Sequence, residues 1–477
     1  MAGPNESDTE ANTVLSHDST TSSITTRIFW RSMILAAGGF VGLVDSSIIA
    51  IAVPDIASDF DAPVNVVQWT SSGYLLAMAT VIPLTSSLCH RYGAQRTWVV
   101  SLVVFTGATL AAGLAWSLGS LIVFRVIQGL GGGMLFPLMR LLAVEIAGQS
   151  RMGRVMALTA VPVQVAPIVG PVLGGVIIDQ SSWRWALWAS IPLALIALIP
   201  AAVWIPNRLI DDVNRVDYWS ILVLMPSVTI VILFLTRVSS SEFSVSTFIF
   251  GIIAVCLLFG FFRRAKSSTR SIGFELTFLR IKSFRATSLI VFSNNFSMMG
   301  VTFLIPLIIE TSDPNESVIT VGLSLAPQGI GTLLSVLYVG KKIDVSGDPR
   351  RLVFAGLTGV AITTFGLAVY ANNLSAPAAL VLLLIRGIAL AFAVAPTMLT
   401  LYAGLPTEKY AEATTTNAIV QQIAGAFGAA FAAVSVQVAS QYASDRNSVF
   451  SLVFAALAII TAATLLSTRG LPTKNSG

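Results

Sequence analysis

The sequence predicts an all-α integral membrane protein with fourteen transmembrane helices, and three observations support this. Hydrophobic residues make up 55% of the 477 residues and charged residues only 11%, whereas an ordinary soluble domain has about 25% charged residues. The mean hydropathy is +0.82. The apolar residues occur in blocks of about twenty, the helical length that crosses a hydrocarbon core of about 30 Å. Such a chain cannot cover a water-facing surface, so we expect it to reside in a membrane.

A polar tail, residues 1–30, precedes the first apolar block. It is rich in Ser and Thr and carries Glu6, Asp8, Glu10 and Asp18. This composition is too polar for a signal peptide. We therefore expect a disordered cytoplasmic tail.

Charged residues and Gly/Pro punctuation divide the remaining chain into spans. The first six are expected near 32–54, 68–88, 97–116, 119–147, 155–178 and 185–205. Two more, near 218–236 and 245–262, lack charges and glycine motifs within the membrane. The last six are expected near 286–309, 318–340, 352–371, 376–401, 413–439 and 449–467.

The longest internal polar segment, Arg263 to Arg285, separates the eighth span from the ninth. It includes an amphipathic stretch, Phe274 to Leu279, which we expect at the membrane interface. The resulting organisation is two six-helix bundles plus two extra central helices. We expect the bundles at 31–206 and 285–468, two linker helices with a cytoplasmic loop at 207–284, and a cytoplasmic tail at 469–477.

The charges of the loops indicate the orientation of the chain. An even number of spans places both termini on one side of the membrane. The loops on that side carry many Lys and Arg residues, whereas the opposite loops contain only Arg184, Arg237 and Arg446 as cations. By the positive-inside rule, we expect a multi-pass protein of the cell (plasma) membrane with both termini cytoplasmic.

An internal repeat supports the division into two bundles. The loop Ser86–Gly93 after the second span matches Gly340–Gly347 after the tenth, and Arg125–Gly129 of the fourth span is similar to Leu384–Gly387 of the twelfth. Two homologous bundles around a central path permit alternating access by rocking. Chance similarity between Gly-containing loops is the alternative explanation.

Several segments together carry a family pattern. They are Leu43–Pro54 in the first span, Gln68-Trp69 and Tyr74–Leu76 in the second, Arg125–Gly131 in the fourth, Gly170–Gly175 in the fifth, and Trp183–Trp185 after it. The chain resembles the major facilitator superfamily, specifically its fourteen-span drug:proton antiporter branch, over residues 30–467. The resemblance implies the major facilitator fold and a secondary antiporter that exports drugs, toxins or natural products by alternating access. It also implies a monomer in the lipid bilayer that uses a proton gradient and no cofactor.

The same resemblance assigns gating roles to two sets of residues. The loop motifs contribute His90, Arg91, Gly93, Gly340, Asp344 and Gly347, and the antiporter motif contributes Gly170, Pro171, Gly174 and Gly175. The family has Gly and Asp where this chain has Ser86 and His90, so the gating contacts attributed to that aspartate lack their usual residue. His90 is either a pH-sensitive substitute or a plain interfacial histidine. In the antiporter motif, glycine allows close helix approach and proline kinks the helix.

Charged residues inside the membrane need a partner or a water-filled cavity. Asp45 lies about thirteen residues, or roughly 20 Å, from the cytoplasmic edge of the first span, and Arg125 lies about five residues inside the outer edge of the fourth. At this shared level we expect an ion pair. Burial raises the pKa of a carboxyl group and a neighbouring arginine lowers it, so a contact that changes with conformation switches proton affinity. We hypothesise that Asp45 takes a proton when open to the outside, and that Arg125, oriented by Gln128, drives its release inward; a static structural pair is the alternative.

A second buried arginine bears on the substrate. Arg386 is expected near the midplane of the twelfth span with no carboxylate clearly at its level. This argues against a pathway tuned only for cations and leaves neutral or anionic substrates open, unless Arg386 snorkels or binds backbone carbonyls. The candidate lining of a mostly apolar cavity consists of Trp69, Tyr74, Asn294, Asn295, Gln328, Arg386, Asn417, Gln421 and Gln422. Trp69 equally suits an interfacial anchor, and the polar residues equally suit contacts between helices.

Other classes of function lack their sequence signals. The chain has no Gly-x-x-x-x-Gly-Lys-Ser/Thr phosphate loop, which argues against an ATP-driven pump. Its two cysteines and two histidines leave little for metal, redox or nucleophilic chemistry, so we expect no metal site and no enzyme. The basic residues lie in short loops, so no nucleic-acid partner is expected. A metabolite facilitator or importer and a non-transporting membrane sensor stay open as alternatives.

Overall fold

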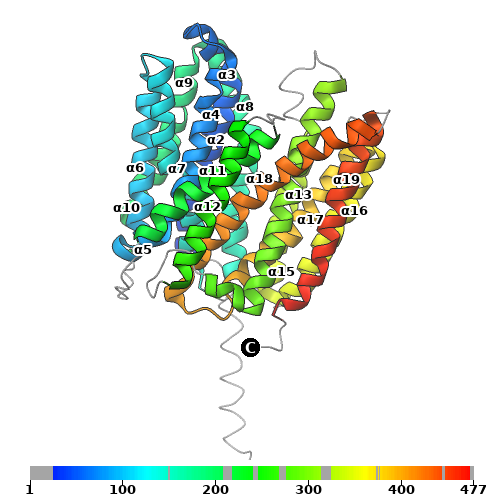
Figure 1. The fold of residues 1–477 in the computed structure, drawn as a ribbon. Helices are drawn as coiled ribbons and strands as arrows, with labels where there is room; N and C mark the ends of the chain where they lie inside the picture. Colours follow the sequence, from blue (N-terminus) through cyan, green and yellow to red (C-terminus); the bar gives the residue numbers. More distant parts are fainter. Residues whose placement is uncertain are drawn as a thin grey trace, which may run out of the picture.

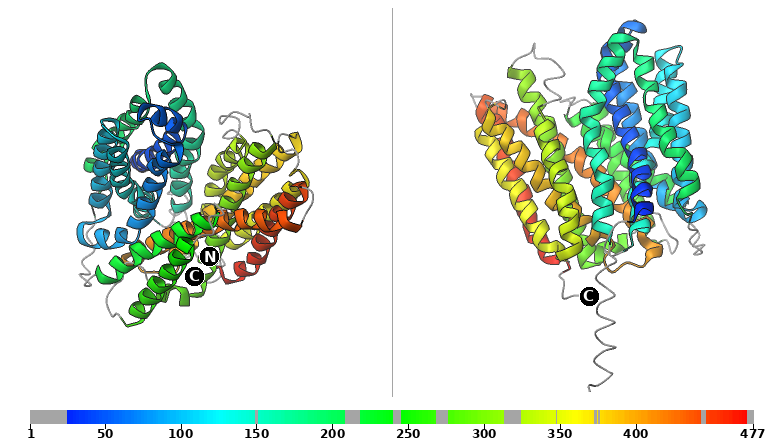
Figure 2. Two further views of the ribbon diagram at one scale, coloured as in Figure 1. Left: turned by 45° about the horizontal axis from the view of Figure 1, so that its top comes forward. Right: turned by 180° about the vertical axis from the view of Figure 1, so that it is seen from behind.

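The computed structural model describes residues 25–148, 151–207, 218–239, 245–267, 276–312, 324–346, 348–371, 374, 376–442 and 446–472. Every regular element within these ranges is a helix. Long apolar runs are expected to form helices in a membrane, because a helix hydrogen-bonds its own backbone N–H and C=O groups and lipid offers them no partners. Figures 1 and 2 show the helices as two groups that stand side by side.

The first group contains the helices up to residue 204. They are α2 (Thr26–Asp59), α3 (Val64–Val67), α4 (Trp69–Val81), α5 (Leu84–Tyr92), α6 (Ala94–Gly113), α7 (Leu118–Ala147), α8 (Met152–Gln180), α9 (Trp183–Trp188) and α10 (Ser190–Trp204). Helix α2 packs on α8 and α10, and α7 packs on α4 and α6. The helices α11 (Tyr218–Ser239) and α12 (Val245–Ser267) follow and pack on each other.

The second group contains the helices from residue 276 onward. They are η2 (Leu276–Arg280), α13 (Lys282–Ser312), α15 (Ala326–Ser346), α16 (Pro349–Val369), α17 (Pro377–Tyr402), η3 (Thr407–Lys409), α18 (Tyr410–Tyr442), α19 (Arg446–Ala463) and η4 (Thr464–Gly470). Helix α17 packs on α15 and α16, and α13 packs on α18. Helix α11 contacts α4 of the first group and α18 of the second.

The all-helical membrane fold is confirmed. Among the described residues, nine helices are long and apolar enough to cross a membrane, or ten if the bent pair α4 and α5 is one span. Helices α11 and α12 contain shorter apolar stretches, Val223–Phe234 and Ser246–Leu257. The number of fourteen spans therefore stays a prediction.

Three elements differ from the expected boundaries. The span expected at 68–88 is bent by 56° between α4 and α5, where Pro83 lacks a backbone N–H and so interrupts the helical hydrogen bonds. The span expected at 185–205 is divided into α9 and α10 at Ala189. Helix α2 begins at Thr26, so residues 26–30 of the expected disordered tail are helical.

The two groups share an apolar core at one end. The largest buried cluster includes Ile34 of α2, Phe284 of α13 and Tyr402 of α17, and Ile28 near the start of α2 packs against it. At the other end each group has its own core, with residues such as Ile56 in the first and Leu304 in the second. We call the shared region the joined end.

Candidate functional site

A buried cluster of polar side chains lies where α2, α4, α6 and α7 meet. Helix α7 carries Arg125 and Gln128 and approaches its neighbours closely through glycine. A Cβ atom on Gly131 would lie 2.7 Å from the backbone nitrogen of Phe105 in α6, and one on Gly133 would lie 2.7 Å from Cα of Met78 in α4. This absence of side chains brings α7 near enough for its polar residues to reach the other helices.

Asp45, Arg125 and Gln128 form the centre of the cluster, and all three are 0% exposed. Arg125 Nη1 donates to Asp45 Oδ2 in a buried ion pair. Gln128 Nε2 donates to the other carboxylate oxygen of Asp45 at 2.9 Å, and Gln128 Oε1 accepts a hydrogen bond from Arg125 Nη1 at 2.6 Å. Gln128 therefore bridges the acid and the base, and orients both.

Further residues complete the surroundings of this ion pair. Gln128 Nε2 also contacts Thr109 Oγ1 at 2.6 Å, and Arg125 Nε donates to the backbone oxygen of Thr70 at 3.1 Å. The Arg125 guanidinium carbon lies 4.3 Å from the ring centroid of Tyr74, whose hydroxyl donates to the Gly42 carbonyl oxygen at 3.3 Å. Sequence reasoning missed Thr109 and Thr70 as partners.

The cluster contains one carboxyl group, that of Asp45, and one cation, the Arg125 guanidinium group. The Asp45 carboxylate accepts hydrogen bonds from Arg125 and Gln128. A proton on this carboxyl group would remove the negative charge that Arg125 faces, so protonation and the position of Arg125 are linked. Within the described part of the chain, no group of three or more His, Cys, Asp or Glu residues is arranged to hold a metal ion.

Arg386 of α17 forms a second buried polar cluster, in the second group of helices. It is buried, and its Nε donates to Thr364 Oγ1 at 3.0 Å, while its Nη2 donates to the backbone oxygen and the hydroxyl oxygen of Ser297, both at 3.1 Å. Its Nη1 donates to Gln328 Oε1. These partners are all neutral. One of them is a backbone carbonyl group, which agrees with the alternative that Arg386 binds backbone carbonyls instead of substrate.

His90 links the two groups of helices at the joined end. Its Nε2 lies 2.9 Å from Glu412 Oε1, which brings the end of α5 against the start of α18. The Glu412 side chain is 2% exposed, and Lys409 Nζ lies 3.9 Å from the same oxygen. Arg140 Nη1 of α7 donates to Gln421 Oε1 of α18 at 3.1 Å. Sequence reasoning singled out His90 and Gln421 but missed Glu412.

Comparison with known proteins identifies the family. The model of the Major Facilitator Superfamily matches residues 35–429 of this chain. The chain belongs to the Major Facilitator Superfamily. It is therefore a multi-pass membrane transporter and not an enzyme, and the predicted resemblance is confirmed.

Three curated relatives of this superfamily member are named as resistance proteins. The chain is 29% identical over 400 residues to the multidrug resistance protein B homolog of Mycobacterium tuberculosis, covering 82% of this chain and 73% of the relative. It is 25% identical over 405 residues to the lincomycin resistance protein LmrB of Listeria monocytogenes, covering 85% of each. It is 26% identical over 339 residues to the putative multidrug resistance protein MdtD of Salmonella typhi, covering 70% of this chain and 71% of the relative.

Solved structures show the same superfamily fold. The proton:xylose symporter XylE matches with a TM-score of 0.64 and 16% identity, covering 94% of this chain and 97% of that structure. The human organic anion transporter MFSD10 matches with a TM-score of 0.65 and 13% identity, covering 92% and 99%. At these identities the likeness concerns the fold alone.

The structure places the expected cavity residues in different surroundings. Tyr74 belongs to the Arg125 cluster and Gln328 to the Arg386 cluster. Trp69 is 45% exposed at the start of α4, Asn295 bonds to Val291 of its own helix, and Gln422 is half-buried on α18. Asn294 and Asn417 are buried, and among the described residues their Oδ1 atoms have no hydrogen-bond partner.

The loop motifs of the superfamily lie at or beside the joined end. Gly93 ends α5 with a φ of 87°, which favours glycine, and Asn207 Nδ2 donates to the Tyr92 carbonyl oxygen beside it at 3.0 Å. Arg91 is exposed. In the second copy, a Cβ atom on Gly340 of α15 would lie 2.7 Å from the Gly153 carbonyl oxygen of α8. The Asp344 side chain and Gly347 lie outside the described residues.

The glycines of the antiporter motif differ in their surroundings. A Cβ atom on Gly170 would lie 3.1 Å from the Val44 carbonyl oxygen of α2, and one on Gly174 would lie 3.3 Å from Ile48. A Cβ atom on Gly175 would meet none of the described residues within 4 Å. Helix α8 is continuous through position 171, although the Pro171 side chain lies outside the described residues. Gly170 and Gly174 are therefore the motif glycines that allow α8 to pack closely against α2.

Proposed function

We propose that this transporter is a proton-coupled secondary antiporter that exports small organic molecules such as drugs, toxins or natural products. The observation that carries the proposal is the fully buried Asp45, paired with Arg125 and bridged by Gln128. A buried carboxyl group with one fixed cation can take up and release a proton as the conformation changes. The drug and lincomycin resistance of the relatives supports the direction of transport and the class of substrate.

The proposed cycle uses the two groups of helices. With both termini in the cytoplasm, the joined end is the cytoplasmic end, and the described conformation is closed on that side. A proton from the outside neutralises Asp45, which leaves Arg125 without a counter-ion and favours rearrangement of the bundles. In the conformation open to the cytoplasm, renewed contact with Arg125 drives the proton off Asp45 and inward.

The proposed cycle depends on the topology of the protein. The chain has fourteen transmembrane helices in the cell membrane, with bundles at 31–206 and 285–468 and two linker helices between them. The protein works as a monomer, and the proton gradient is its only energy source. The loop cations and the internal repeat support this arrangement.

Whole-cell efflux separates this function from its rivals. Cells that lack their own pumps would express the chain and be tested for resistance and dye efflux against a panel that includes lincomycin. Efflux that a protonophore abolishes supports the antiporter. Uptake of a panel compound would indicate an importer or facilitator, and the absence of any transport would indicate a sensor.

A further inference from the structure

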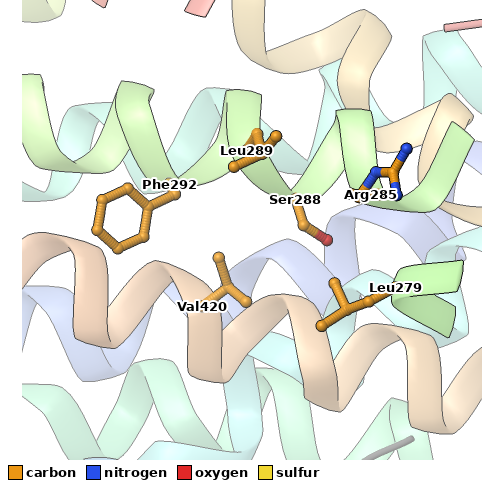
Figure 3. Close-up of a pocket in the computed structure, with 6 residues that line it drawn as sticks. All are labelled: Leu279, Arg285, Ser288, Leu289, Phe292 and Val420. Atoms are coloured by element: carbon orange, nitrogen blue, oxygen red, sulfur yellow. The ribbon is translucent and has the colours of Figure 1, made fainter. Parts of the chain in front are cut away.

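A groove of about 330 Å³ lies between α13 and α18 near the joined end. It is lined by Leu279 of η2, by Arg285, Ser288, Leu289 and Phe292 of α13, and by Val420 of α18. Figure 3 shows Ser288 and Phe292 facing the space between the two helices, with Arg285 toward one end and Phe292 at the other. From Arg285 to Phe292 the groove follows roughly 10 Å of helix.

The groove opens to the surface of the helices. Leu289 is 49% exposed, and the ring of Phe292 lies 6.4 Å from the ring of Phe427, which is 42% exposed. Four of the six lining residues are apolar. A surface of this kind suits contact with hydrocarbon rather than with water.

Two polar features interrupt this apolar lining. Ser288 is 7% exposed, and among the described residues its Oγ has no hydrogen-bond partner. A buried hydroxyl group without a partner is unfavourable, so an acceptor from outside the chain would satisfy it. Arg285 is exposed at the end of the groove, and Arg280 and Lys282 are exposed within the preceding turns.

We propose that this groove binds an acyl chain of an anionic phospholipid from the cytoplasmic leaflet. The phosphate group pairs with Arg285, the Ser288 hydroxyl donates to an ester carbonyl of the lipid, and the acyl chain runs from there against Val420 and Phe292. Negatively charged lipids are attracted to basic residues at the cytoplasmic surface. A free phosphate ion would not use the apolar lining. A zwitterionic lipid has the same phosphate group but also brings a cation toward Arg280, Lys282 and Arg285, so its net attraction to them is weaker. The inference rests on the cytoplasmic orientation proposed above.

Native mass spectrometry of the full-length protein tests this inference with matched lipids. The purified protein would be titrated with dioleoylphosphatidylglycerol and with dioleoylphosphatidylcholine, which have the same acyl chains. We expect one phosphatidylglycerol molecule to bind about fivefold more tightly than phosphatidylcholine. Arg285→Gln should remove this preference, whereas Lys341→Gln, at an exposed basic residue of α15 outside the groove, should keep it.

A second variant tests the groove itself. Ser288→Leu places a larger apolar side chain inside it and should remove the tight phosphatidylglycerol adduct, with folding checked by circular dichroism. If this variant does not fold, Arg285→Gln at the surface still decides the question. Equal binding of the two lipids, a folded Ser288→Leu variant with the adduct intact, or displacement of the lipid by inorganic phosphate would overturn the inference. The titration needs no proton gradient, so its result is independent of whether the protein is an antiporter.

Discussion

Asp45, Arg125 and Gln128 depend on one another because all three are fully buried and hydrogen-bonded to each other. Removal of one member of a buried ion pair leaves an uncompensated charge and typically destabilises a protein by about 3–5 kcal/mol. Replacement of both charges by neutral groups avoids this penalty. The stability of the cluster and its role in transport are therefore separable by mutation.

Arg125→Leu should lower thermal stability and abolish proton-driven efflux, because Asp45 then keeps only Gln128 of its two hydrogen-bond donors. The loss of stability should be about 3–5 kcal/mol. Adding Asp45→Asn to Arg125→Leu should restore much of the stability but no coupling. Thermal unfolding in detergent and efflux in cells measure the two effects. Equal stability of Arg125→Leu and the wild type would show that the pair is not a tightly buried one.

Part of this cluster was predictable from sequence. The depths of Asp45 and Arg125 along their spans follow from helical rise, and charges at one level inside a membrane need each other. Thr109 and Thr70 were not predictable, because their contacts depend on how α6 and α4 are rotated against α7. The contact between Glu412 and His90 was not predictable either, because the two residues are 322 positions apart and meet only when the two groups of helices pack together.

The contact between His90 and Glu412 predicts an unusual response to mutation. His90→Asp introduces the residue usual in the family, but it places a second carboxylate against the buried Glu412. We expect the contact between α5 and α18 at the joined end to weaken and efflux to slow. The second change, Glu412→Gln, should restore transport. Double-mutant analysis of efflux rates should give a coupling of about 0.5–3 kcal/mol. Normal transport by His90→Asp alone would show that this contact does not hold the two bundles together.

Among the helices, α8 shows how a sequence motif and a packing contact can differ. The motif contains three glycines, but only Gly170 and Gly174 face α2 within contact distance, whereas the space at Gly175 is open. Their spacing in the sequence predicts that all three allow close helix approach. The rotation of α8 about its axis determines which glycines pack against α2.

Gly170→Leu and Gly175→Leu form a matched pair that tests this packing. A side chain at position 170 must displace Ser47 or the Val44 carbonyl group of α2, so we expect a loss of stability of about 1–3 kcal/mol. The same change at position 175 should leave stability within about 0.5 kcal/mol. Thermal unfolding of the two purified variants makes the comparison. Similar destabilisation by both changes would contradict the packing of α8 on α2.

The helices themselves were largely predictable from hydropathy, and their breaks less so. Apolar length locates a helix such as α6, expected at 97–116 and observed at Ala94–Gly113. The bend at Pro83 depends on whether neighbouring helices accept a proline within the span, which hydropathy does not report. The cavity lining stays a prediction. In this structure Gln328 is hydrogen-bonded to Arg386, and Asn295 to Val291 of its own helix.

For the whole molecule, the two groups of helices differ in the partners of their buried arginines. The first holds an acid paired with Arg125, whereas Arg386 of the second is held by neutral partners. In the proposed cycle the proton is carried by the Asp45 carboxyl group of the first group. The shared core at the joined end and the separate cores at the other fit a transporter whose bundles rock against each other.

The most direct test of proton coupling is proton movement in proteoliposomes that enclose a pH-sensitive dye. The purified wild-type protein, given an exported compound found in the resistance screen, should change the internal pH when the compound is added, and a protonophore should abolish the change. Asp45→Asn should move no protons with the compound, while still exchanging labelled for unlabelled compound across the membrane. A full proton signal from Asp45→Asn would contradict the proposal that this carboxyl group couples the proton to transport.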